Sequence, residues 1–401
     1  MLSLEDASER LGSRARLTDP EPIGLADAVG RVLVDPRVVA AVDVPPFANS
    51  AMDGFAVRAA DTPGRLRVVG EVAAGAADLP TVDAGTAVRI MTGAPVPPGA
   101  DTVVPIEEAS EDVDTVEIAE GVPGGRYIRA AAHDTRVGDE ICLPGELTPA
   151  KIAVIASLGI GGVEVRRRPV VAILSTGDEL VAPGEPLGAG QIHDANTVAL
   201  AAAVVEAGGE PLVLPRQADE ESPIERALLD AARRTDVVVS SGGVSVGRRD
   251  YVRTVLERHG SLDFWRIAVQ PGKPLAVGSI GGATVIGLPG NPVSALVTFE
   301  LFVRPFIRSM LGLEGDGRLH VWARPASRIE KDPDRRAFLR VTVWQEAGEL
   351  HARAAGGQAS SQLRPMADGN ALLVVPEGQA AAETALTYEA IVFAPMRLPP
   401  A

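Results

Sequence analysis

The sequence predicts a multidomain α/β protein whose central domain is a doubly wound α/β fold. Three observations lead to this expectation. Residues 169–311 alternate between apolar strand-like runs and helical segments, as in a parallel sheet covered by helices. Residues 42–125 contain short runs of β-forming residues separated by Gly and Pro turns, which predicts a small β-rich domain. Residues 320–401 return to short alternating strands, for which we expect a β-barrel, with a sandwich as the alternative.

The elements of the central domain follow from the hydrophobic period. Residues 170–174 are a continuous apolar run, as expected for a buried parallel strand, and residues 236–240, with three consecutive valines, are expected to form a second buried strand. Helices are expected over 194–207, 251–259 and from 292 to about 310. Ser222 and Glu225 have the spacing of a capping box, which predicts one further helix start at this point.

The N-terminal region is expected to be helical and discontinuous in sequence. Residues 25–34 read as a helix that ends before Pro36, and residues 150–158 read as a helix that packs with the N-terminal helices. The predicted domains are therefore an N-terminal helical linker domain (1–41 plus 126–167), a small β domain (42–125), an α/β domain (168–313) and a C-terminal β domain (320–401).

Composition and charge exclude several classes of function. The formal net charge is −15 in 401 residues, so the chain lacks the basic footprint of a nucleic-acid-binding protein. No basic amphipathic stretch and no apolar run of membrane-spanning length is present, and the N-terminus does not resemble a signal peptide, so we expect a cytoplasmic protein. The single cysteine, Cys142, excludes a disulfide framework and a cysteine zinc site.

Three loops follow the expected strands of the central domain, where ligands of open α/β sheets bind. They cover residues 175–179, 240–247 together with Asp250, and 288–294. Their glycines allow close approach of the backbone to a ligand, and successive N–H groups can hold an anion. Each loop alone is more often a simple turn, but three on one sheet edge favour a site for an anionic ligand. Lys273, one of three lysines in an arginine-rich chain, lies in a nearby Pro-Gly-Lys-Pro turn.

The whole motif set resembles the molybdopterin molybdenumtransferase (MoeA) family, which is related to the E domain of gephyrin. Segments 45–54 and 89–101 of the β domain, which otherwise read as turn chemistry, belong to this set. The matching motifs are NSAMDG (49–54), RIMTGAPVPPGADTVV (89–104), STGDEL (175–180), SSGGVSVG (240–247), PGKP (271–274) and LPGNPVSA (288–295). The resemblance covers essentially the whole chain.

The resemblance implies an insertase that binds adenylated molybdopterin and molybdate, uses Mg²⁺, releases AMP and acts as a homodimer. Residues implied to act in catalysis are Asp53, Thr92, Glu179, Asp219 and Asp250, with Asp53 and Thr92 supplied by the partner subunit and with Asp219 and Asp250 as the Mg²⁺ ligands. Residues implied to bind the substrates are Ser175, Thr176, Gly177, Asp178, Asp194, Ser241, Gly242, Gly243, Lys273, Pro289, Pro292, Ser294, Arg335 and Ser360.

The sequence also departs from the family pattern. Ala48 stands where an Asp is common, His133 lies in a segment that usually reads Gly-Glu-Asp, and Gln270 occupies a position that is often Lys. Two alternatives to the insertase stay open: a non-catalytic pterin-binding scaffold or carrier of the same family, and a molybdopterin adenylyltransferase. The extra N- and C-terminal domains argue against the adenylyltransferase. Selectivity between molybdate and tungstate does not follow from the sequence, because the two oxyanions are alike in size and charge.

Overall fold

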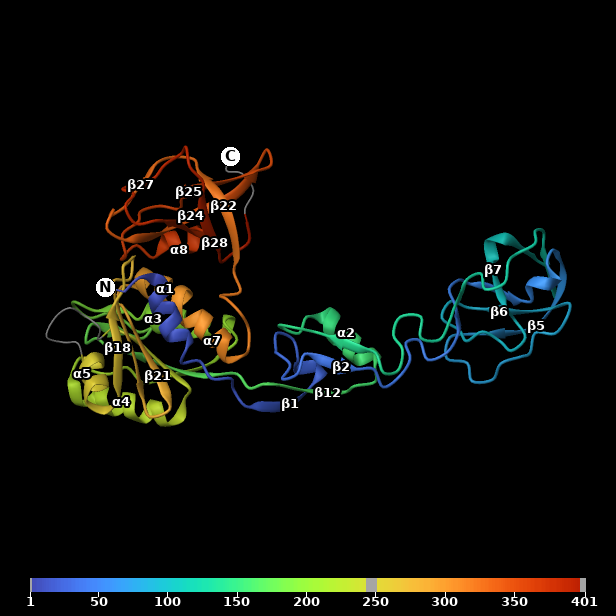
Figure 1. Cartoon of the computed structure of the whole chain (residues 1–401), viewed down its shortest axis with the longest axis horizontal. Coiled ribbons are helices and arrows are strands. Elements are labelled where there is room, and N and C mark those ends of the chain that lie inside the picture. The colour runs from blue at the N-terminus through green and yellow to red at the C-terminus, as the bar shows by residue number, and fades with distance from the viewer. Residues whose placement is uncertain (1, 243–250, 397–401) are drawn as a thin grey trace. The chain divides into compact units, whose positions relative to one another are not determined.

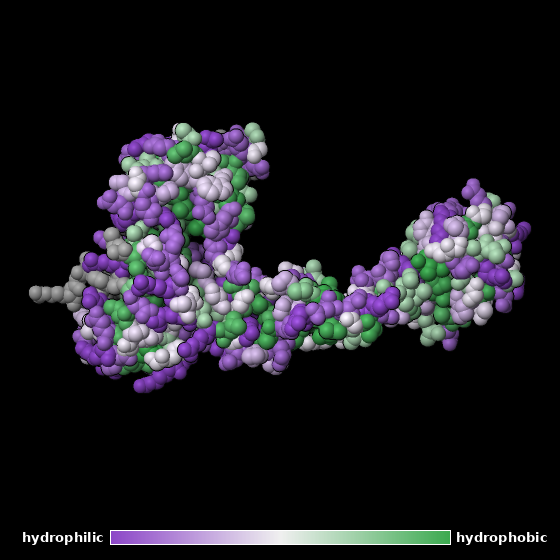
Figure 2. Space-filling model, in the orientation of Figure 1, coloured by the Kyte–Doolittle hydropathy of each residue, from purple (hydrophilic) through white to green (hydrophobic). Residues whose placement is uncertain are grey.

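A computed structural model describes residues 2–242 and 251–396 of the chain (Figure 1). The chain forms two compact units. The first combines Met1–Glu21 with Arg166–Ala401, and the second consists of Pro22–Val165. Figure 2 shows hydrophilic and hydrophobic residues interspersed over the face drawn for each unit. Among the described residues, no helix is both long enough and apolar enough to cross a lipid bilayer.

The centre of the first unit is a six-stranded sheet with the strand order β16-β13-β17-β21-β20-β18. Strands β16 (Glu210–Val213), β13 (Val170–Ser175), β17 (Val237–Ser241) and β21 (Ala283–Leu288) are parallel to one another. Strands β20 (Pro274–Ile280) and β18 (Ser261–Arg266) extend the sheet antiparallel to their neighbours. The carboxyl ends of β13, β17 and β21 therefore meet at one edge.

Helices cover both faces of this sheet, which confirms the doubly wound fold (Figure 1). Alternate side chains of β13 point to opposite faces, so that Val171 and Ile173 join one core while Ala172 and Leu174 join the other. The first face carries α1 (Leu4–Gly12), α3 (Ala195–Glu206), α6 (Pro292–Thr298), the π-helical segment Phe299–Val303 and α7 (Arg304–Met310). The second face carries α4 (Glu221–Arg234) and α5 (Tyr251–His259).

Two expectations for this unit need correction. Helix α4 begins at Glu221 with Glu220 as its N-cap, so the capping box at Ser222 is not formed. Its proposed partner, Glu225, instead accepts hydrogen bonds from Arg258 and His259 of the neighbouring α5. The first 21 residues were expected to pack with 126–167 but belong to this unit, because the buried apolar face of α1 joins the first core.

The C-terminal region is a closed five-stranded barrel, as predicted. Its strands are β22 (Leu319–Pro325), β24 (Arg336–Glu346), β25 (Glu349–Ala354), β26 (Ala371–Val375) and β28 (Tyr388–Val392). The barrel closes because β26 pairs with both β24 and β28. The short strand β19 (Val269–Gln270) runs parallel to β24 and joins the barrel to the central domain.

The second unit contains a curled six-stranded sheet with the order β7-β4-β6-β5-β9-β8. The strands are β4 (Gly54–Val57), β5 (Gly64–Val72), β6 (Thr86–Ile90), β7 (Thr102–Pro105), β8 (Ala109–Glu111) and β9 (Thr115–Ile118). Phe55 and Val104 pack on one face, and Ala56 and Val103 pack on the other. Each face of the curled sheet is therefore buried against a small apolar core of its own.

The rest of this unit surrounds helix α2 (Pro149–Ser157). Its buried Ile155 packs with Leu33 and Leu147. This part of the unit also contains two short antiparallel strand pairs. Strand β2 (Arg37–Val39) pairs with β11 (Glu140–Cys142), and strand β3 (Asn49–Ser50) pairs with β10 (Ile128–Arg129). Strands β1 (Pro20–Gly24) and β12 (Gly162–Arg166) pair where the chain enters and leaves the unit.

The helix expected over 25–34 is wrong. Only a single 3₁₀ turn, Leu25–Asp27, forms there. Gly30 adopts a φ of 72°, which stops a right-handed helix, and Leu33 then forms a β-bridge with Val165. The apolar residues that suggested a helical period are buried by these bridges instead.

Candidate functional site

A cavity of about 770 Å³ opens at the carboxyl edge of the central sheet. The three loops singled out in the sequence contribute to it, together with the start of α3 and the turn before β20. Its described lining residues are Thr176, Gly177, Glu179, Leu180, Ile192, His193, Asp194, Ala195, Asn196, Asp219, Ser241, Gly242, Lys273, Pro274, Pro289, Gly290, Asn291, Pro292 and Ser294. Most of the candidate binding residues are therefore brought together here.

The first loop is held tightly against the sheet. Thr176 donates its N–H to the Ser241 carbonyl at 3.3 Å. Gly177 has a φ of 148°, and a Cβ at this position would lie 2.7 Å from a Glu179 carboxylate oxygen. Asp178 is not among the described lining residues, but its carboxylate accepts the backbone N–H of Asp219, which lines the cavity, at 3.2 Å.

The second loop is described only up to Gly242. Ser241 is 3% exposed and lines the cavity, as expected of a ligand-binding hydroxyl. The N–H of Gly242, however, donates to the Leu288 carbonyl at 3.2 Å and is therefore engaged within the protein. The candidate residues Gly243 and Asp250 lie outside the described residues.

The third loop and the Pro-Gly-Lys-Pro turn complete the cavity. Pro289, Pro292 and the buried Ser294 line it from the end of β21 and the start of α6. Lys273 is exposed and is the only lysine or arginine among the described residues that line this cavity. In Gly272, with a φ of 118°, a Cβ would lie 2.4 Å from the Thr298 side chain, so the turn requires glycine before Lys273.

Two candidate residues come from the barrel and reach the cavity indirectly. Ser360 accepts a hydrogen bond at 3.0 Å from Asn291, which lines the cavity. Arg335 binds the carboxylate of Asp332 at 2.6 Å, and the Asp332 N–H donates to the Gln270 side chain at 3.2 Å. Gln270 therefore connects Arg335 to the turn that presents Lys273.

Asp194 lines the cavity and also caps the helix that begins beside it. Its carboxylate caps α3, accepting the Thr197 N–H at 3.0 Å and the Thr197 hydroxyl at 2.6 Å. Both carboxylate oxygens are thus occupied by the helix start. The structure indicates that Asp194 positions α3 at the cavity wall.

Asp53 and Thr92 lie together in the second unit. Thr92 donates both its N–H, at 2.7 Å, and its hydroxyl, at 2.9 Å, to the same Asp53 oxygen. These two hydrogen bonds, the backbone one first, hold the pKa of the exposed Asp53 carboxyl below its ordinary value. The two residues, which the resemblance assigns together to the partner's site, are therefore in direct contact with each other.

Sequence reasoning missed two asparagines that line the cavity. Asn196 donates to the Ser241 hydroxyl and to the Gly290 carbonyl, both at 2.7 Å. Asn291 donates to Ser360. Asn291 was inside a quoted motif, and Asn196 follows the expected helix start, but a polar residue in the first turn of a helix is common and gives no specific signal.

Comparison with known proteins identifies the family. The MoeA N-terminal region (domain I and II) matches residues 2–159, a probable molybdopterin-binding domain matches 172–309, and the MoeA C-terminal region (domain IV) matches 323–386. The chain belongs to the MoeA family.

Relatives of this MoeA-family chain are similar over nearly their whole lengths. Molybdopterin molybdenumtransferase 2 of Mycobacterium tuberculosis is 38% identical over 392 residues, covering 94% of this chain and 96% of that protein. Molybdopterin molybdenumtransferase of Haemophilus influenzae is 36% identical, covering 97% and 98%. The crystal structure of a molybdopterin biosynthesis MoeA protein from Pyrococcus horikoshii is 32% identical with a TM-score of 0.83, covering 98% of this chain and 100% of that one.

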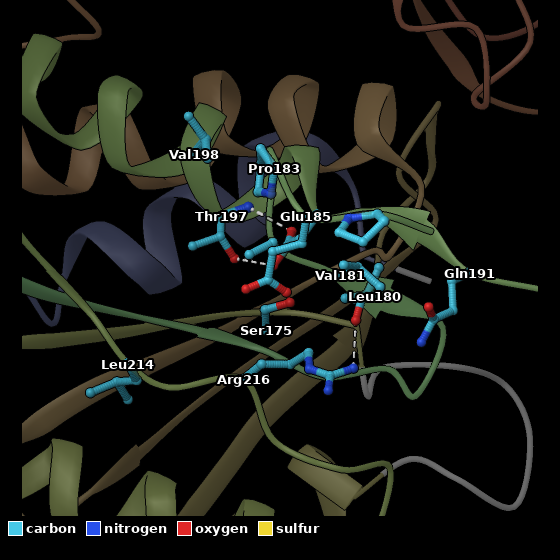
Figure 3. Close-up of a pocket in the computed structure, with 13 residues that line it drawn as sticks. Ser175, Leu180, Val181, Pro183, Glu185, Gln191, Thr197, Val198, Leu214 and Arg216 are labelled. Carbon is cyan, nitrogen blue, oxygen red and sulfur yellow. Dashed lines mark hydrogen bonds between the residues drawn. The ribbon is translucent and has the colours of Figure 1, made fainter. Parts of the chain in front are cut away.

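A second cavity, of about 460 Å³, adjoins the main one in this MoeA-family chain (Figure 3). Leu180 and Asp194 line both cavities. The wall is mixed. Apolar contributions come from Leu180, Val181, Ala182, Pro183, Pro186, Val198 and Leu214, and polar ones from Ser175, Glu185, Gln191, Asp194, Thr197 and Arg216. Ser175 also faces this cavity, is 2% exposed, and its hydroxyl has no hydrogen-bond partner among the described residues.

Arg216 holds the loop between the two cavities. It donates to the carbonyls of Leu180 at 2.5 Å and Gly177 at 3.2 Å (Figure 3 shows the first of these). Strands β14 (Leu180–Val181) and β15 (Ile192–His193) pair at the same place. The wall that separates the cavities is therefore fixed by backbone contacts at both ends.

Proposed function

We propose that this chain is a molybdenum insertase, which inserts molybdate into adenylated molybdopterin with release of AMP and so forms molybdenum cofactor. The observation that carries the proposal is the main cavity, where serine hydroxyls, backbone groups and Lys273 gather at the carboxyl edge of the sheet. Molybdate is a tetrahedral dianion that requires several short-range donors and at least one cation. The relatives' name, molybdopterin molybdenumtransferase, supports the same reaction.

We assign each candidate residue to one part of the two substrates. Lys273 and Ser294 would bind the molybdate oxygens, and Ser241 would donate to the adenylyl phosphate. Pro289 and Pro292 would fix the third loop, with Ser360 and Arg335 completing the oxyanion site. Molybdenum would exchange two of its oxygens, which leave as water after protonation, for the two dithiolene sulfurs of the pterin. Attack of a water or molybdate oxygen on the adenylyl phosphorus would break the phosphoanhydride bond and release AMP.

The second cavity would hold a ring of the same substrate. Adenylated molybdopterin carries two flat nitrogen heterocycles joined to a charged phosphate centre. A pocket whose wall combines apolar side chains with hydrogen-bonding groups, next to the main cavity, suits such a ring. The unpartnered hydroxyl of Ser175 would supply a hydrogen bond to a ring nitrogen or carbonyl.

Mg²⁺ would be held by Asp219 and Asp250. No group of three metal-ligating side chains is found within residues 2–242 and 251–396. Magnesium sites that include substrate phosphates require only one or two protein carboxylates, so Asp219, which lines the cavity, fits such a site, while Asp250 lies outside the described residues. When bound, the ion would neutralise phosphate charge.

The proposal also includes the assembly. The chain would act in the cytoplasm as a homodimer, with Asp53 and Thr92 of one subunit serving the cavity of the other. Residues 42–125, 168–313 and 320–401 would each form a domain, and residues 22–41 together with 126–165 would form the linker domain of the second unit. Asp53 would orient a water or an oxygen ligand, because a carboxylate is a poor partner for an anion.

The decisive experiment is AMP release from adenylated molybdopterin with Mg²⁺, with and without molybdate. We expect AMP release that depends on molybdate, and a product that activates an apo-molybdoenzyme. Tight pterin binding without AMP release would reject the insertase and indicate a carrier or scaffold.

A further inference from the structure

The side chain of Asn196 links two of the cavity loops through one nitrogen atom. Its Nδ2 lies 2.7 Å from the Ser241 hydroxyl oxygen and 2.7 Å from the Gly290 carbonyl oxygen. A carbonyl oxygen can only accept a hydrogen bond, so the atom facing Gly290 must be the amide nitrogen. The contact with Gly290 therefore fixes the orientation of the whole amide group.

This orientation determines the direction of the Ser241 hydroxyl. The second hydrogen of the same –NH₂ group donates to the Ser241 oxygen, which thus acts as the acceptor in this pair. The proton of the hydroxyl is left for another partner. Because Ser241 is 3% exposed and lines the main cavity, that proton is directed toward whatever occupies the cavity.

A related pair lies at the barrel side of the site. Asn291 donates its Nδ2 to the Ser360 hydroxyl oxygen at 3.0 Å, and with the amide in this orientation the hydroxyl proton is free to donate. The buried Arg340 binds the carbonyls of Gly357 and Ala359 at 3.2 and 3.1 Å. In a trans peptide the N–H points opposite to the carbonyl, so the Ser360 N–H faces away from Arg340.

We propose that Asn196 and Asn291 are positioning residues that hold Ser241 and Ser360 as hydrogen-bond donors to the anionic substrate. The inference rests on the proposed function, since it concerns the phosphate and oxyanion groups expected in the cavity. A neutral amide performs this task without adding negative charge beside an anion. An aspartate at either position would accept the serine proton and reverse the direction of the hydrogen bond.

A double-mutant cycle on AMP binding tests the first pair. Isothermal titration calorimetry with AMP and Mg²⁺ is applied to wild type, Asn196→Ala, Ser241→Ala and the double variant. Each single substitution should weaken AMP binding about tenfold, because a hydrogen bond to a charged group is lost or misdirected. The double variant should bind no more than about twofold more weakly than Ser241→Ala, since Asn196 acts through that hydroxyl.

The second pair is tested by kinetics. Asn291→Ala and Ser360→Ala should each raise the KM for molybdate with little change in kcat, and the effects should again not add. Ser361→Ala, which removes the exposed neighbouring hydroxyl, is the matched control and should leave KM unchanged.

For the first pair, Asn196→Asp should lower AMP affinity more than Asn196→Ala. The melting temperature of each variant shows whether it is folded.

The outcomes separate this inference from the proposed function. If wild type binds AMP and Asn196→Ala weakens binding by the same factor with and without the Ser241→Ala substitution, the positioning role is rejected while the insertase proposal stands. Full additivity in the Asn291 cycle would reject the role for the second pair. If wild-type protein binds no AMP, the proposed function fails and this inference fails with it.

Discussion

At the scale of single residues, the cavity depends on one ammonium group. Lys273 is the only lysine or arginine among the described lining residues, so no other described lining residue carries a permanent positive charge. Lys273→Met should raise the KM for molybdate at least about tenfold, because an ion-paired hydrogen bond to a dianion is removed. Steady-state AMP release at varied molybdate concentration measures this.

The matched control is Lys151→Met, which removes a half-buried lysine of the second unit that binds the Glu146 carbonyl. It should behave as wild type in the same assay. Lys273→Arg should restore the charge but not the full activity, because a planar guanidinium does not fit the place of a compact ammonium. A Lys273→Met protein with an unchanged KM for molybdate would contradict the assignment.

Asp53 and Thr92 give a prediction about pH. The pKa of Asp53 lies below its ordinary value because Thr92 donates two hydrogen bonds to it. A depressed carboxyl pKa stabilises the folded state above the unfolded-state pKa, and this contribution is lost as pH falls through the folded-state pKa. Thr92→Val removes the hydroxyl bond and should raise the Asp53 pKa toward its ordinary value, as measured by carbon NMR of the carboxyl group.

Thr92→Ser retains a hydroxyl and should keep the pKa of Asp53 low. An unchanged Asp53 pKa in Thr92→Val would mean that the backbone N–H alone causes the shift. As pH falls, activity should be lost at a higher pH in Thr92→Val than in wild type, since Asp53 is proposed to act ionised.

At the scale of elements, the start of α3 determines where Asn196 lies. Asp194 caps this helix through Thr197, and Asn is as good an N-cap as Asp. Asp194→Ala should cost about 1 kcal/mol locally and speed hydrogen exchange in the first turn of α3 about fivefold, whereas Asp194→Asn should not.

The same pair distinguishes capping from charge. If Asp194 only positions α3, Asp194→Asn should keep near-normal AMP release. Loss of activity in Asp194→Asn with wild-type exchange rates would show that its charge contacts the substrate instead.

The sequence predicted the elements whose hydrophobic period is strong and local. The parallel strands, the helices over 194–207 and 251–259, and the barrel all match the structure. The failures have one physical origin, which is that tertiary partners overrode local signals. Glu225 accepts hydrogen bonds from Arg258 and His259 of α5, and Leu33 forms a β-bridge with Val165.

The site shows the same division. Loop residues at the carboxyl edge were predictable because parallel topology brings strand ends together, and Thr176, Ser241, Pro289 and Ser294 line one cavity. The Gly242 N–H, the cap role of Asp194 and the amide bonds of Asn196 were not, since hydrogen-bond direction depends on three-dimensional placement. Gln270 was expected only as a missing cation, whereas its side chain connects the Lys273 turn to Asp332.

At the scale of the whole molecule, the proposal divides one site between two subunits, and mixing two inactive variants tests this. Asp53→Ala and Lys273→Ala should each be folded and inactive. If Asp53 of one subunit serves the cavity of the other, a hybrid dimer contains one site with both residues intact. Refolding the two variants together in equal amounts should then restore about a quarter of wild-type AMP release, because half of the dimers are hybrids with one working site of two.

A site built within one subunit gives the opposite result. Each subunit of the hybrid would then carry one substitution in its own cavity, and no activity would return. Size-exclusion chromatography with light scattering establishes that dimers form, and separately tagged subunits allow the hybrid to be isolated. Activity in the purified hybrid near half that of wild type would support the shared site. An inactive purified hybrid would mean either that Asp53 and Lys273 of the same subunit act together or that Asp53 does not act at the site.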